Sequence, residues 1–229
     1  MPFLLNDPTF MLLIPALIFA FWAQFYVKSN YEKFSKKENS RGITGAEAAK
    51  RILSENGVDS IEIEQIRGEL TDHYDPRTRK LRLSGAVYSG KSIAAIGVAA
   101  HESGHAIQHA TGYAAIHARN AIYPVAAFGS NLAFPLFAVG LFFLNSKFLM
   151  DLGIMLYIVA LCFTVITLPV EFNASGRAIK ILSDGKYLVG DELNGARKVL
   201  RAAAMTYIAA TAMAAIQLLR MLVLRDRRN

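Results

Sequence analysis

The sequence predicts an α-helical membrane protein that carries a small α+β domain, with three or four apolar helices and a short antiparallel sheet. Of its 229 residues, 53% are hydrophobic and only 19% are charged, which excludes a disordered chain. Long uncharged runs alternate with polar blocks that show the patterns of folded structure. The single cysteine, Cys162, excludes an internal disulfide framework and a cysteine-based zinc site.

The first apolar run, residues 10–27, has no charged side chain and is about long enough to cross a bilayer as a helix. Trp22, Tyr26 and Lys28 border its end, as aromatic and basic residues do at a membrane interface. The run lacks the basic leader and the cleavage site of a signal peptide. We therefore expect residues 1–27 to form a retained N-terminal membrane anchor.

Two further apolar runs, residues 123–144 and 149–169, are separated only by a short polar turn. They predict a transmembrane helical hairpin over residues 122–170. The remaining block, residues 171–229, contains a fourth stretch at 202–219 that is uncharged but Ala-rich and only weakly apolar. Whether this stretch spans the membrane is left open by the sequence.

The distribution of lysine and arginine predicts the orientation, because cytoplasmic loops carry an excess of both. Residues 1–9 contain neither, whereas five basic residues closely follow the first run: Lys28, Lys33, Lys36, Lys37 and Arg41. This places the N-terminus outside and residues 28–121 and 170–201 in the cytosol. A spanning fourth stretch would put three arginines outside, against the rule: Arg225, Arg227 and Arg228. The net charge of +7 accordingly indicates an anionic membrane face, and no nucleic-acid partner is expected.

Two helices are predicted within the cytosolic block, residues 28–121. Thr44 and Glu47 have the spacing of a capping box, which opens a helix that Gly57 stops. Small apolar residues predict a second, buried helix over about 92–112.

A short sheet is predicted between these two helices. Isoleucines and polar residues nearly alternate over 61–66, as in a half-buried strand. Two further strands, 70–74 and 80–83, flank the turn Asp75-Pro76-Arg77-Thr78. The expected result is a small antiparallel sheet.

The second helix carries His101-Glu102-Ser103-Gly104-His105, the H-E-x-x-H pattern. Residues four apart share a helix face, so both imidazoles can reach one zinc ion at about 2.0–2.1 Å. Glu102 lies beside them, placed to take a proton from water that the metal activates. Burying two histidines and a glutamate in an apolar helix costs free energy unless these side chains have partners. This favours a zincin-like metal site over a purely structural helix.

A catalytic zinc ion needs a third protein ligand and an open position. His109 lies ~12 Å along the helix from His101 and cannot readily join it on one ion. The metzincin pattern would need a glycine and a histidine where Gln108 and Thr111 stand, so that class is excluded. Glu171, directly after the third apolar run, is the better candidate.

Glu171 is expected near the start of a new helix segment, because Pro169 suits a first helical turn. Ala174 and Ala178 would give this segment a small face that approaches the zinc-binding helix closely. The alternative is that Glu171 only caps a helix N-terminus.

The order of these segments resembles the YugP-type neutral zinc metallopeptidases of prokaryotic membranes, more distantly the HtpX-type membrane proteases and other gluzincins. The resemblance covers nearly the whole chain and rests on AAHESGHAIQHATGY and LPVEFNASGRA. It implies zinc bound by His101, His105 and Glu171, with Glu102 as the general base.

This sequence departs from that family pattern at one place. Related proteins carry an acidic residue shortly after the third ligand, where it supports a ligand histidine. Here the nearby positions are Asn173, Ser175 and Gly176, so this support must come from a neutral side chain or from elsewhere.

In this class an edge strand before the zinc helix typically pairs with an extended peptide substrate. Residues 70–74 or 81–84 are candidates for that edge, and His73 or Tyr74 would then donate to the oxyanion. Exposed hairpin residues without a role are the favoured alternative. Arg177 fits a supporting role or a surface position equally well, and His117, like His109, receives no role.

The favoured function is a membrane-anchored zinc metalloendopeptidase of the prokaryotic inner membrane, acting on protein or peptide substrates, membrane proteins among them, from the cytosolic side. One alternative is a site-2-type intramembrane metalloprotease with Asp184 as third ligand, although Asp184 stands in a polar stretch. Another is a non-catalytic membrane scaffold with a structural metal. Structural zinc sites usually use four protein ligands, whereas three good candidates converge here.

Overall fold

A computed structural model describes residues 8–227, which are mostly helical with one small sheet. The described residues belong to two compact units. Of these residues, unit 1 comprises 8–24, 118–168 and 206–227, and unit 2 comprises 25–117 and 169–205. The first seven residues of the expected anchor and Arg228 lie outside the described residues.

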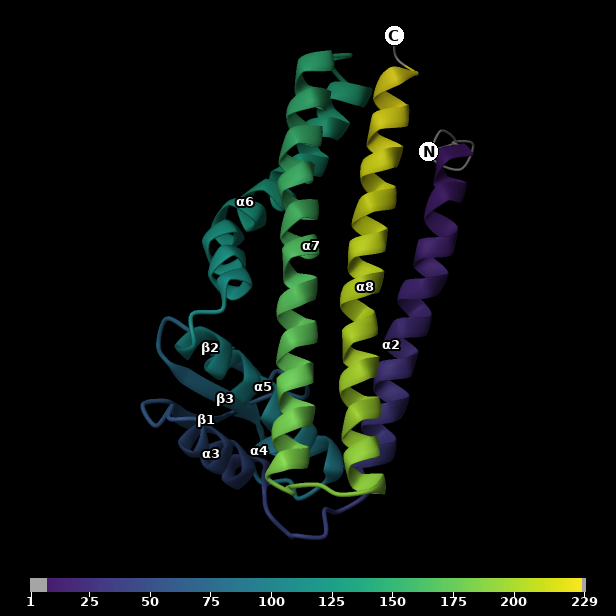
Figure 1. Cartoon of the computed structure of the whole chain (residues 1–229). Helices are drawn as coiled ribbons and strands as arrows, with labels where there is room; N and C mark the ends of the chain where they lie inside the picture. Colours follow the sequence, from purple (N-terminus) through teal and green to yellow (C-terminus); the bar gives the residue numbers. More distant parts are fainter. Residues whose placement is uncertain (1–7, 228–229) are drawn as a thin grey trace. The chain divides into compact units, whose positions relative to one another are not determined.

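The elements follow one another as Figure 1 labels them. They are η1 (Pro8–Leu12), α2 (Leu13–Ser35), α3 (Gly45–Glu55), β1 (Glu62–Ile66), β2 (His73–Asp75), β3 (Lys80–Ser84), α4 (Gly85–Tyr88), α5 (Ile93–Ala110), α6 (Ala114–Phe142), α7 (Lys147–Asp184) and α8 (Asp191–Asp226). The predicted class, an α-helical membrane protein with a small α+β part, is confirmed.

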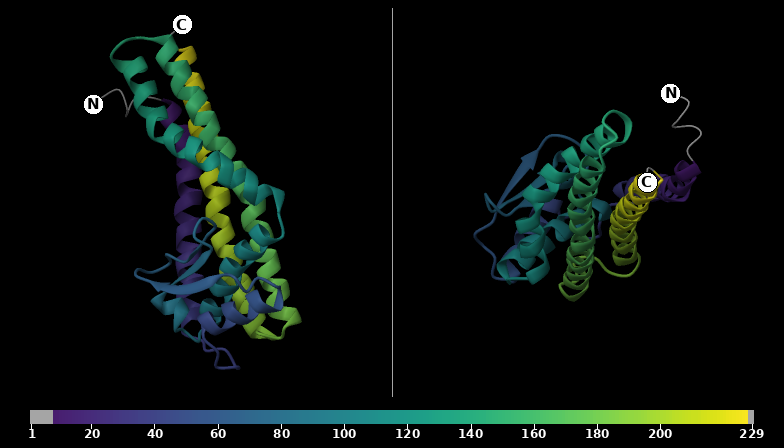
Figure 2. Two further views of the ribbon diagram at one scale, coloured as in Figure 1. Left: turned by 90° about the vertical axis from the view of Figure 1, so that its left-hand side faces the viewer. Right: turned by 90° about the horizontal axis from the view of Figure 1, so that it is seen from above.

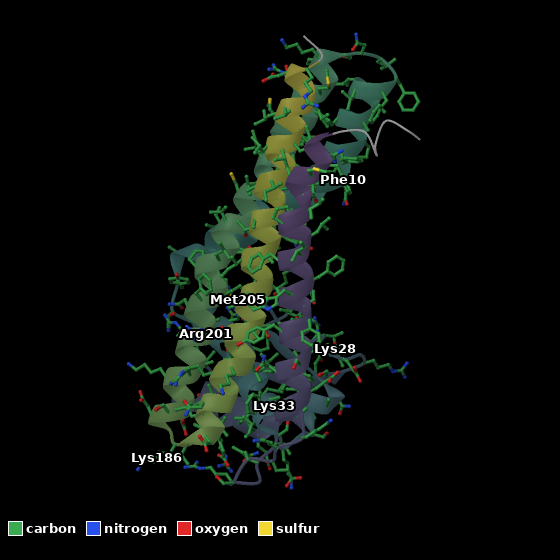
Figure 3. All side chains as sticks on the ribbon, turned by 90° about the vertical axis from the view of Figure 1, so that its right-hand side faces the viewer. Phe10, Lys28, Lys33, Lys186, Arg201 and Met205 are labelled. Carbon is green, nitrogen blue, oxygen red and sulfur yellow. The ribbon has the colours of Figure 1, made fainter. Side chains whose placement is uncertain are left out.

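Four helices are long and apolar enough to cross a membrane: Thr9–Ser35, Ala114–Phe142, Lys147–Asp184 and Asp191–Asp226. Along the first, apolar side chains extend from Phe10 to Lys28, the first basic residue of the sequence (Figure 3). The second and third are consecutive helices joined by a short turn (Figure 2). The Ala-rich fourth stretch belongs to α8, which is as long as a spanning helix requires.

The expected break before Glu171 is wrong. Helix α7 continues from Lys147 to Asp184 with Pro169 inside it. A single proline removes only its own backbone donor, so the flanking turns keep their hydrogen bonds and the helix persists. Glu171 is therefore an interior residue of a long helix and not an N-terminal cap.

Helix α3 begins as the sequence predicted, with a complete capping box. The Glu47 backbone N–H donates to Thr44 Oγ1 at 3.2 Å, and the Thr44 N–H donates to Glu47 Oε2 at 2.8 Å. These bonds satisfy two backbone donors that the first helical turn would otherwise leave unpaired.

The sheet has the order β1-β3-β2 and is mixed, which corrects the expectation of a wholly antiparallel sheet. Strands β2 and β3 form the predicted antiparallel hairpin, whereas β1 pairs parallel with β3, Glu62 opposite Lys80. The connecting residues 67–72 cross to the far side of β3, and the Asp72 carboxylate accepts the Ser84 N–H at 2.7 Å. Leu70 has a φ of 54°, a left-handed conformation that prevents the longer strand expected over 70–74.

Helix α5 lies at the centre of unit 2 and is buried along most of its length. Its Ser92 cap accepts the Ala95 N–H at 3.1 Å, which starts the helix where the sequence predicted. Buried apolar residues of α3, β3, α7 and α8 share one core cluster with it. The helix that carries His101 and His105 is thereby held on several sides.

Candidate metal centre

Three side chains from two helices of unit 2 converge on one point. His101 and His105 lie one turn apart on α5, and Glu171 faces them from α7. Glu171 Oε2 lies 3.3 Å from His101 Nε2 and 3.6 Å from His105 Nε2. One ligand atom from each residue lies within 4.8 Å of the other two. This is the grouping that the H-E-x-x-H pattern and Glu171 predicted.

The Glu171 carboxylate shows that these residues fit a metal ion. Glu171 is only 2% exposed, and its Oε2 atom has no hydrogen-bond partner among the described residues. A buried, unsatisfied carboxylate oxygen is costly unless a cation compensates it. Two imidazole nitrogens and one carboxylate oxygen are also a donor set that zinc takes in metallopeptidases.

Glu102 is buried next to this group on α5, with 8% of its surface exposed. Burial raises its pKa above the ordinary value for glutamate, although the neighbouring histidines oppose the shift. For His105, burial disfavours the charged ring, but the Glu171 and Glu102 carboxylates outweigh it and raise the pKa. A carboxyl group with a raised pKa is better suited to hold and return a proton near neutral pH.

Neutral side chains support both histidines from behind. The Ser175 hydroxyl lies 3.1 Å from His101 Nδ1, and Gln108 Oε1 lies 3.0 Å from His105 Nδ1. Ser175 was among the positions singled out from the sequence. The sequence patterns above predict no such role for Gln108, although its position three residues after His105 places both side chains on the same helix face.

Small residues allow α5 and α7 to approach closely at the site. A Cβ atom added to Gly104 would lie 2.9 Å from the Ala174 carbonyl oxygen, too close for the present packing. Ala174 and Ala178 are fully buried, which confirms the small face expected on the Glu171 helix. The contact sets how near Glu171 comes to the two histidines.

The remaining candidates lie elsewhere in unit 2. His73 is exposed on β2, with Nδ1 2.8 Å from the Thr71 carbonyl oxygen. The Tyr74 hydroxyl lies 2.9 Å from His109 Nδ1, and the His109 ring lies 5.6 Å from that of His117. Among the described residues, neither His73 nor Tyr74 hydrogen-bonds to the three converging side chains.

Asp184 and Arg177 are also accounted for by their positions on α7. Asp184 is the last residue of the helix and is not part of the His101, His105 and Glu171 group. Arg177 is half-buried, and its Nε donates to Asn173 Oδ1 at 2.8 Å.

Comparison with known proteins agrees with this geometry. Residues 9–226 match the sequence profile of a family described as "Putative neutral zinc metallopeptidase". The chain belongs to this family. The "Putative membrane protease YugP" of Bacillus subtilis (strain 168) is 52% identical over 213 residues, which cover 93% of this chain and 94% of that protein. No solved structure matches the chain.

The family membership confirms the resemblance seen in the sequence and supports zinc as the metal of the site. The relative's description as a membrane protease and the four apolar helices together support a membrane protein.

Proposed function

We propose that this protein is a membrane-anchored zinc metalloendopeptidase that hydrolyses peptide bonds by metal-activated water. The observation that carries the proposal is the buried, unpartnered Glu171 oxygen facing two histidine Nε2 atoms, with Glu102 beside them. Two histidines and Glu171 alone would also suit a structural metal site. The buried Glu102 carboxylate beside them supplies the proton-transfer group that a catalytic site needs.

His101, His105 and Glu171 would hold the zinc ion. When bound, zinc supplies Lewis-acid polarisation of a carbonyl group and lowers the pKa of water towards ~7. Three protein ligands leave an open position for solvent and substrate, which distinguishes catalytic from structural zinc sites.

Glu102 is proposed as the catalytic residue that moves the proton. Its carboxylate takes a proton from the attacking water as the water oxygen bonds to the peptide carbonyl carbon. The carboxylic acid then gives this proton to the leaving amine nitrogen as the carbon–nitrogen bond breaks. The raised pKa of Glu102 suits both halves of this exchange, because the group must hold the proton between the two steps.

The substrate is proposed to be an extended peptide on the cytosolic side. Strand β2 is an edge of the sheet, so its outer backbone groups can pair with such a chain. His73 and Tyr74 on β2 stay the candidate oxyanion donors. The cytosolic side follows from the lysines and arginines after the first apolar run.

Replacement of Glu102 tests the proposal. Glu102→Gln should reduce cleavage of casein by roughly 10²–10⁴-fold, because proton transfer is lost while the shape is kept. Metal analysis should still find close to one zinc ion per chain, since Glu102 is not a ligand. Phenanthroline should block the wild-type protein, as expected of a metal-dependent enzyme.

Cleavage by Glu102→Gln at a near-native rate would refute this role of Glu102. A wild-type protein that retains zinc but cleaves neither casein nor an unfolded membrane protein would instead support the scaffold alternative.

A further inference from the structure

We propose that Gln108 is a positioning residue that fixes the tautomer of His105 and ties this histidine to the helical turn that carries Glu171. This inference rests on the proposed metal site but not on the proposed peptidase activity. It concerns how the side chains of His105 and Glu171 are positioned to receive a metal ion.

Gln108 is fully buried and uses both ends of its side-chain amide. Its Oε1 lies 3.0 Å from His105 Nδ1. Its Nε2 donates to the Val170 carbonyl oxygen at 2.8 Å and to Asn173 Oδ1 at 2.9 Å. One side chain on α5 thus contacts a histidine on its own helix and two groups on α7.

The chemistry of these partners allows only one orientation of the amide. The Val170 carbonyl can only accept a hydrogen bond, so it must face the NH₂ group of Gln108. The Gln108 oxygen must then face His105, and it can only accept. The hydrogen of the neutral imidazole is therefore on Nδ1, and the lone pair on Nε2 is directed to the side where Glu171 Oε2 lies.

Arg177 enforces the same polarity from the other end. Asn173 Oδ1 receives hydrogen bonds from both Arg177 Nε, at 2.8 Å, and Gln108 Nε2. A guanidinium group can only donate, so the Asn173 oxygen must face it. The Asn173 oxygen is thereby an acceptor for the Gln108 NH₂ group, independently of Val170. The orientation of the Gln108 amide is thus determined from two sides.

Gln108 also couples the positions of two ligands. Val170 directly precedes Glu171, so the bond from Gln108 to the Val170 carbonyl holds the backbone of the third ligand against the helix of His105. His101 lacks this control, because the Ser175 hydroxyl can either donate or accept. His105 and Glu171 are thus preset for the metal as a pair.

Zinc affinity, measured by competition with a chromophoric chelator on the full chain, tests this inference. Gln108→Met keeps the approximate size but removes all three hydrogen bonds, and it should weaken zinc binding roughly 10–100-fold. Asn173→Leu should weaken binding in the same direction, whereas Asn173→Asp keeps both accepting interactions and should stay within about threefold of wild type. The cobalt-substituted Gln108→Met protein should show an altered visible absorption spectrum, because the field around the ion changes.

Ser103→Ala is the matched control. Ser103 is fully buried on the same helix, and its hydroxyl donates to the Ala99 carbonyl at 2.8 Å, away from the ligands. Its zinc affinity and cobalt spectrum should equal those of wild type. If Gln108→Met does not fold, the comparison of Asn173→Leu with Asn173→Asp still tests the inference.

Zinc affinities of Gln108→Met and Asn173→Leu within about threefold of wild type would overturn the inference. Equal weakening by Ser103→Ala would also overturn it, because general loosening of α5 would then explain the loss. A wild-type protein that binds zinc but cleaves no peptide would refute the proposed activity and leave the role of Gln108 standing.

Discussion

The Glu171 carboxylate is only 2% exposed, so its charge must be stabilised by neighbouring groups. Among residues 8–227, no hydrogen bond is made to its Oε2 atom. The Nε2 atoms of His101 and His105 approach this oxygen without satisfying it. In the neutral form that a metal ligand requires, His105 carries its hydrogen on Nδ1, so its Nε2 lone pair faces the lone pairs of the Glu171 oxygen. A divalent cation is the species that turns this unfavourable arrangement into a stable one.

Alanine substitutions at the two acidic candidates on α7 distinguish the third ligand. Glu171→Ala should lose most of its bound zinc, because only two histidine ligands remain. Asp184→Ala should keep it, since Asp184 lies ~20 Å farther along the continuous helix. Metal content of the purified proteins is the measurement, and zinc loss confined to Asp184→Ala would favour the site-2-type mechanism instead.

The close approach of α5 and α7 depends on small residues at their contact. Gly104 faces the Ala174 backbone, where an added methyl group would lie 2.9 Å from the carbonyl oxygen. A backbone atom at that distance cannot turn away as a flexible side chain can, so the helices would have to separate. Separation would move Glu171 away from His101 and His105.

Gly104→Ala should therefore weaken zinc binding by roughly tenfold or more and lower the free energy of unfolding by about 1–3 kcal/mol. Gly176→Ala is its counterpart on α7, because an added Cβ atom meets nothing within 4 Å there. This variant should bind zinc normally and gain about 0.5–1 kcal/mol, as alanine does over glycine within a helix. Chelator competition and thermal unfolding in detergent measure both effects; tight zinc binding by Gly104→Ala would show that the crossing tolerates a wider separation.

At the scale of the whole chain, the four apolar helices and the uneven distribution of lysine and arginine bear on the orientation in the membrane. Lys28 and Lys33 follow the apolar part of α2, and Figure 3 shows both on this helix. Among the first 27 residues there is no lysine or arginine. The positive-inside rule therefore predicts that the residues following this helix face the cytosol.

Single cysteines in a Cys162→Ala background test this orientation. A cysteine at Lys147, the first residue of α7, should react with a membrane-impermeant maleimide in intact cells. A cysteine at the exposed Lys36 should react only after the inner membrane is permeabilised. The reverse pattern would place the site residues of α5 outside the cytosol.

The local features of this protein were readable from its sequence. Helix α5 and its His101–His105 spacing depend on contacts within one or two turns, as do the Thr44 capping box and the apolar helices. The position of Glu171 directly after the third apolar run makes it a candidate ligand, and it lies beside both histidines in the folded chain. Such features follow from short-range geometry and hydropathy.

Other features required the folded chain. The Gln108 and Ser175 bonds join residues 62 and 74 positions apart, and the parallel pairing of β1 with β3 depends on a crossing segment. The course of α7 through Pro169 is likewise set by its surroundings and not by the residue type. The sequence therefore indicated the candidate ligands, because residue types and spacing are local. Tertiary contacts decided the tautomer of His105 and the separation of α5 and α7, because hydrogen-bond polarity and packing depend on which groups meet in space.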